Sequence, residues 1–196
     1  MKQGYAQRWN KPEFVSTPTL QVLHDLALMN KDGQLTNVAL ILLGKSEAIR
    51  KHLYCDRVTV EYRLYHSMIE YTARQKPLVL MVDSVWDYIN QLASNPLQHY
   101  NEGFRIGDIP AFNREVVREA ILNACCHRVM YIQSDVVIKQ YLDQLIITNA
   151  GGSPVGVDNI LTVNSMPRCK LITEVLQKSA FIKRVGSDKA GHWEIR

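Results

Sequence analysis

The sequence has no long apolar run, no paired-cysteine motif and no block of concentrated charge. No apolar stretch reaches membrane-spanning length, and the first residues lack the pattern of a signal peptide, so we expect a cytoplasmic protein with no membrane partner. The four cysteines form no Cys-x-x-Cys pair, which argues against a zinc site and suits a reducing compartment. A net charge of +4, without a long basic run, permits a nucleic-acid or nucleotide partner without indicating one.

Several local signatures of catalysis are also missing. No Ser-His-Asp or Cys-His arrangement has supporting spacing. The segment Gly44-Lys45-Ser46 lacks the first glycine of a P-loop, so a P-loop motor is excluded.

The apolar periodicity predicts an α+β fold in a chain of 196 residues. Residues 1–18 are interpreted as an arm, and residues 97–110 as a loop. The predicted helices are 19–29, 35–43 (with Thr36 as its cap and Gly44 as its stop), 77–93, 111–128 (with Asn113 as its cap) and 167–178, and the predicted strands are 57–64, 135–141, 145–148 and 181–185.

The helix predicted over 111–128 carries a polar stripe. Glu119, Asn123 and His127 are four residues apart, so they stack on one helix face, with apolar residues on the neighbouring faces. A strand and the turn 149–152 (Asn-Ala-Gly-Gly) follow, and glycines let backbone N–H groups approach a ligand closely. A carboxylate, an amide and such a turn can hold a metal-bound phosphate ligand.

The spacing alone also fits two simpler interpretations. Glu119 and Asn123 have the pattern of a solvated face on an amphipathic helix, and a Gly-Gly pair is usually an ordinary turn. His127 and Arg128 suit the helix dipole at a C-terminal end for purely structural reasons.

Four segments occur in the order found in a known family. The sequence resembles the C-terminal ATPase-like domain of RecG-related helicase-like proteins and transcriptional regulators, which usually carry an upstream Schlafen-type AlbA domain. The segments are 118–128 (REAILNACCHR), 147–154 (ITNAGGSP), 165–168 (SMPR) and, ahead of them, 35–45 (LTNVALILLGK).

The resemblance implies a distant relationship to the GHKL ATPases, such as gyrase, histidine kinases and MutL. It implies a Bergerat-like sandwich of helices on a mixed, largely antiparallel sheet over residues 107–196, with 1–106 as an arm and a smaller α/β linker region. The upstream AlbA-type domain is expected to be missing, and DNA would be contacted through that domain. Because the P-loop is absent, helicase activity is not supported.

The resemblance also implies roles for individual residues, with ATP and magnesium as the expected cofactors. Glu119 matches the glutamate that orients water, and Asn123 matches the asparagine that binds magnesium. His127 and Arg128 follow on the same helix as nucleotide-binding candidates. The remaining binding candidates, Asn149, Gly151 and Gly152, stand at the turn that contacts adenine.

Three departures from the family pattern predict weak hydrolysis or none. Asn149 replaces an aspartate, the segment 155–164 is a short lid with a single glycine, and the terminal glycine pattern is altered. One alternative is therefore a degenerate, non-catalytic scaffold for dimerisation or DNA-binding regulation. A further alternative is direct nucleic-acid binding by an aromatic and basic cluster, comprising Tyr62, Arg63, Tyr65, His66, Tyr71 and Arg74.

Overall fold

The computed structural model describes twelve parts of the chain. They are residues 6, 10, 12–53, 58–65, 69–74, 76–91, 93–102, 105–152, 158, 167–178, 182–185 and 192–195. The segment 155–164, which is predicted to be a lid, lies almost wholly outside these residues.

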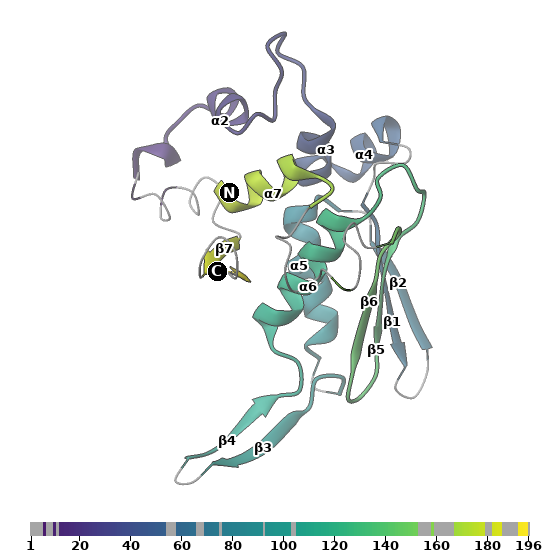
Figure 1. Ribbon diagram of the computed structural model, residues 1–196. Coiled ribbons are helices and arrows are strands. Elements are labelled where there is room, and N and C mark those ends of the chain that lie inside the picture. The colour runs from purple at the N-terminus through teal and green to yellow at the C-terminus, as the bar shows by residue number, and fades with distance from the viewer. Residues whose placement is uncertain are drawn as a thin grey trace.

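The described residues form an α+β fold, in which two helices pack on one face of a mixed four-stranded sheet (Figure 1). The strand order is β2-β1-β5-β6, with β1 and β5 parallel and both outer pairs antiparallel. The strands are β1 Val60–Tyr65, β2 Ile69–Arg74, β5 Val136–Gln140 and β6 Leu145–Thr148. The sequence predicted β1, β5 and β6, and it missed β2.

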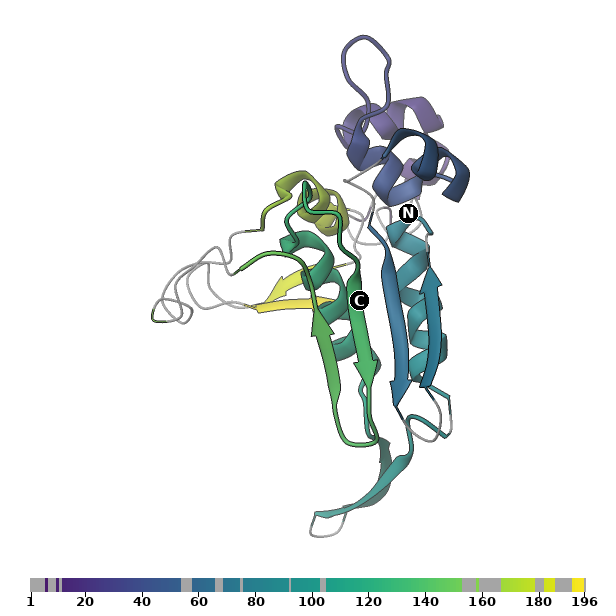
Figure 2. The same ribbon diagram turned by 90° about the vertical axis from the view of Figure 1, so that its right-hand side faces the viewer.

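Alternation along β5 shows which face of this strand is buried. In β5, Val136, Ile138 and Gln140 are buried, and the residues between them are partly exposed. The buried residues face helices α5 (Leu78–Ile89) and α6 (Arg114–His127), which cover the same side of the sheet (Figure 2).

Both helices were predicted, and the caps expected from the sequence are present. The Asn113 side chain accepts hydrogen bonds from the N–H groups of Glu115 and Val116, at 2.9 and 3.3 Å. In α3 (Asn37–Leu43), the Thr36 hydroxyl accepts from the Ala39 N–H at 3.2 Å, and Gly44 ends the helix.

The N-terminal part adds short helices beyond one end of the sheet, at the top of Figure 1. They are η1 Pro12–Val15, α2 Thr19–Asp25, α3 and α4 Ser46–His52. Phe14, in the segment interpreted as an arm, is buried in the core. Helix α4 was not predicted.

The prediction of a loop over 97–110 is wrong. These residues form an antiparallel hairpin of β3 (Leu97–Glu102) and β4 (Arg105–Pro110) that projects from the body (Figures 1 and 2). The polar strand β3 and the Gly107 and Pro110 of β4 obscure the apolar alternation that the prediction required.

The C-terminal elements are α7 (Lys170–Lys178), β7 (Ile182–Val185) and β8 (His192–Ile195), with β8 beside α6. The sequence predicted α7 and β7 but not β8. The four-stranded sheet contains strands from both sides of residue 106. The domain boundary expected between residues 106 and 107 remains a prediction.

Candidate nucleotide-binding site

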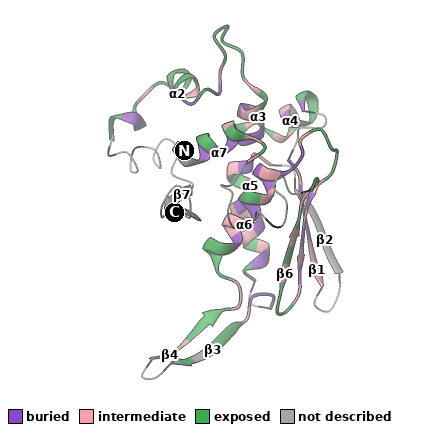
Figure 3. Cartoon of the chain, in the orientation of Figure 1, coloured by how far each residue is buried: buried purple, intermediate pink, exposed green. Residues whose placement is uncertain are grey.

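Helix α6 presents the predicted polar stripe away from the sheet. Ile121 is fully buried, and Glu119 and Asn123 are each two positions from it, or about 200° around the helix. Asn123 is exposed and Glu119 is half-buried, in agreement with that geometry. Figure 3 shows that α6 carries exposed and intermediate residues as well as buried ones. The acid and the amide therefore share the helix face that is turned away from the sheet, one turn apart.

The turn after β6 is fastened to the C-terminal end of the same helix. The Asn149 Nδ2 donates to the Ala124 carbonyl at 3.0 Å, and the Val129 N–H donates to the Ala150 carbonyl at 2.9 Å. Gly151 has a φ of 101°, a conformation that favours glycine. The structure thus brings Asn149, Gly151 and Gly152 to α6.

The segment before α7 joins the same place. The Arg168 Nη2 donates to the Gly152 carbonyl at 2.6 Å, and the Cys169 N–H donates to the Cys126 carbonyl at 3.3 Å. Sequence reasoning assigned no role to Arg168, although it lies in one of the segments that carry the family resemblance.

Arg128 lies apart from this surface. Its side chain is 1% exposed, and its Nη2 donates to the Ile132 carbonyl at 2.9 Å. This hydrogen bond supports the chain segment that leaves α6. The nucleotide contact expected of Arg128 remains a prediction.

Helix α6 carries two thiols near its C-terminal end. Cys125 and Cys126 are buried and free of disulfides. Burial raises the pKa of Cys126 to about 12 and raises the pKa of Cys125 further, so both thiols stay protonated at neutral pH.

His127 is half-buried on the stripe. Burial, and secondarily the charge of Arg168, lower its pKa from 6.5, so His127 is neutral at pH 7.

This shift predicts a loss of stability in acid. Because the unfolded chain binds the proton more readily, the free energy of unfolding decreases as pH falls below about 6.5. Urea unfolding at pH 7.5 and 5.5 should show a smaller decrease for His127→Gln than for the parent chain. His99→Gln, on the exposed hairpin, is the control, and equal decreases in parent and His127→Gln would contradict the assignment.

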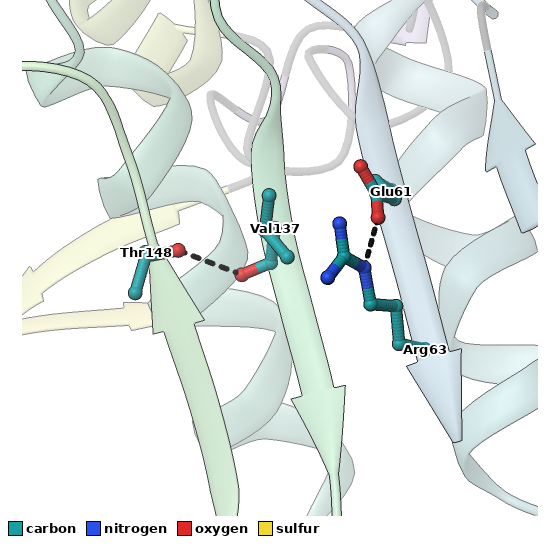
Figure 4. A network of polar contacts seen from close by, with 4 residues as sticks. All are labelled: Glu61, Arg63, Val137 and Thr148. Carbon is teal, nitrogen blue, oxygen red and sulfur yellow. Dashed lines mark hydrogen bonds and ion pairs between the residues drawn. The ribbon is translucent and has the colours of Figure 1, made fainter. Parts of the chain in front are cut away.

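The aromatic and basic cluster is only partly a surface. Tyr62 is buried and donates to Gln140, Arg63 pairs with Glu61 (Figure 4), and Tyr65 stacks on Tyr141 with ring centroids 5.1 Å apart. The side chains of His66, Tyr71 and Arg74 lie outside the described part. The buried Tyr62 ring cannot stack on a base, and the charge of Arg63 is compensated by Glu61. The cluster therefore has fewer groups that could contact a nucleic acid.

The described residues contain neither a metal-binding cluster nor a membrane-spanning helix. No cluster of three or more histidine, cysteine, aspartate or glutamate side chains is placed to hold a metal ion there. No helix in the same part of the chain is sufficiently long and apolar to cross a membrane.

Comparison with family models and with curated proteins gives no match. Among solved structures, the chain is similar to the DIP2311 protein of Corynebacterium diphtheriae, with a TM-score of 0.69 and 22% identity. The similarity covers 89% of this chain and 35% of that one, so the chain spans about a third of its length. At this identity the likeness concerns the fold alone, and it supports the α+β architecture.

Proposed function

We propose that this chain contains an adenine-nucleotide-binding module of the GHKL ATPase type. The observation that carries the proposal is the attachment of the glycine turn to α6 through the Asn149–Ala124 and Val129–Ala150 hydrogen bonds. That attachment brings the turn to the helix whose outward face presents Glu119 and Asn123. The family resemblance assigns nucleotide contacts to both elements.

The side chains at these positions fit magnesium and adenine. Mg²⁺ needs few protein ligands, since phosphate oxygens and waters complete its coordination, so the exposed amide oxygen of Asn123 can suffice without an acidic cluster. Asn149 donates through Nδ2 to the helix, which orients its Oδ1, an acceptor suited to the adenine amino group. Glu119 would orient water.

We propose binding with little hydrolysis. An amide accepts a weaker hydrogen bond from adenine than a carboxylate does, and the lid segment 155–164 is short. Bonds from Asn149 and Arg168 to the backbone fix the turn within the protein itself, as the alternative of a non-catalytic scaffold requires.

Calorimetric titration with ATP, with and without Mg²⁺, tests the proposal. We expect Mg-dependent binding by the parent chain and about tenfold weaker Mg-dependent binding by Asn123→Ala. Asn101→Ala, an exposed amide on the projecting hairpin, is the matched control and should bind like the parent. Absence of heat from the parent at millimolar ATP, with a dimer in light scattering, would favour the scaffold instead.

A further inference from the structure

Three basic side chains lie near the end of α6 and the glycine turn, and they differ in what they can offer a ligand. They are His127, Arg128 and Arg168. We propose that Arg168, to which the family resemblance assigns no role, recognises the phosphate chain of the nucleotide while it holds the Gly152 carbonyl. This inference rests on the proposed function and assigns the anion-binding residue of that site.

The geometry of the Arg168 contact leaves most of its donors available. A guanidinium has five N–H donors in a planar fork, and the bond from Nη2 to the Gly152 oxygen, at 2.6 Å, uses one of them. Arg168 is exposed, so the rest of the fork is accessible to solvent. A guanidinium held at one end loses less side-chain entropy when a second, bidentate contact forms with a phosphate.

The charge of Arg168 is also uncompensated in the described part of the chain. The ion pairs found there join Arg63 to Glu61, His99 to Asp108 and Arg114 to Asp83, and none involves Arg168. An arginine kept at a glycine turn by a neutral carbonyl retains its full positive charge for an anion.

The other two basic residues are less suitable. Arg128 is buried, so its guanidinium is not accessible to a phosphate, and its Nη2 donates to the Ile132 carbonyl. His127 is half-buried, and the lowered pKa of its imidazole leaves it neutral at pH 7, so it brings no charge to a phosphate. Arg168 is therefore the cation at this end of α6 that combines exposure with a fixed position.

The experiment compares ADP with adenosine, two ligands that differ only in the phosphate chain. We expect the parent chain to bind ADP more tightly than adenosine. Arg168→Gln retains a donor for the Gly152 carbonyl but lacks the charge, so it should bind ADP at least tenfold more weakly while its affinity for adenosine is unchanged. Arg168→Lys should recover part of the loss, because lysine supplies charge without the fork.

Lys170→Ala is the matched control, since Lys170 is an exposed cation two residues away at the start of α7. It should bind ADP like the parent. Thermal melts establish that each variant folds. Arg168→Gln is preferred to alanine at this position because glutamine keeps an N–H donor.

The outcomes separate this inference from the function on which it rests. If the parent binds neither ADP nor adenosine, the nucleotide-binding function fails. If the parent binds ADP and Arg168→Gln binds it equally well, the function stands and the role of Arg168 is overturned. An equal loss of ADP and adenosine binding in Arg168→Gln would also overturn it, because it would reduce Arg168 to a structural support of the turn.

Discussion

Replacement of Gln140 by methionine is expected to lower the free energy of unfolding by about 3 kcal/mol or more. Gln140 is fully buried in β5. Its Oε1 accepts from the Tyr62 hydroxyl at 2.6 Å, and its Nε2 donates to the carbonyls of Ser94 and Ile89 at 2.6 and 3.2 Å. Methionine fills similar space but supplies neither the donor nor the acceptor, so the groups that Gln140 satisfies lose a partner without gaining water.

Urea unfolding of the single and double variants measures this network. Tyr62→Phe removes the hydroxyl that bonds to Gln140, so the double variant should lose less stability than the sum of the two single changes. Gln144→Met, in the exposed turn between β5 and β6, is the control. A loss of less than about 0.5 kcal/mol for Gln140→Met would show that the network contributes little.

The same residue shows where sequence reasoning stops. Periodicity predicted β5, since Val136 and Ile138 alternate with more polar residues. The pattern cannot reveal that Gln140 continues the buried face, because the tertiary fold brings its partners to it. These are the carbonyls of Ile89, at the end of α5, and of Ser94, in the segment that follows. Caps such as Thr36 and Asn113 were predictable because their bonds are local.

The missed elements have the same cause. The hairpin β3–β4 projects from the body, and β3 and most of β4 have too little core-facing alternation to register as strands. β2 is an edge strand, and it forms a strand because it pairs with β1, a contact that the local sequence does not reveal.

In the candidate site, the stripe of Glu119, Asn123 and His127 followed from helix geometry alone. The attachment of the 149–152 turn to α6, and the place of Arg168 beside it, depend on contacts between distant segments. Those contacts are what the structure adds to the family resemblance.

Gly151→Ala is the second change with a large expected effect, and it tests whether the turn is built for its position at α6. With φ at 101°, any side chain at this position is strained, at a cost of about 1–3 kcal/mol. An added Cβ would also overlap the Val129 Cγ2 methyl and come within 3.2 Å of its Cβ. Val129 is buried and β-branched, so it has little freedom to move aside.

We therefore expect Gly151→Ala to lower the free energy of unfolding by about 3 kcal/mol in urea titrations, and to weaken ATP binding if the turn forms the site. Gly152→Ala is a control one residue away, because nothing lies within 4 Å of an added Cβ and its φ is not in the left-handed region. Its effect should stay within about 1 kcal/mol.

The Val129→Ala background separates the two causes of the loss. Removing the Val129 methyl groups relieves the overlap but not the backbone strain, so Gly151→Ala should cost about 1 kcal/mol less there than in the parent chain. If Gly151→Ala lowers the free energy of unfolding equally in both backgrounds, the whole loss comes from the strained backbone at Gly151. Equal, small effects of Gly151→Ala and Gly152→Ala would contradict the close contact between the turn and α6, and with it the geometry that brings the glycine turn to the Glu119–Asn123 helix.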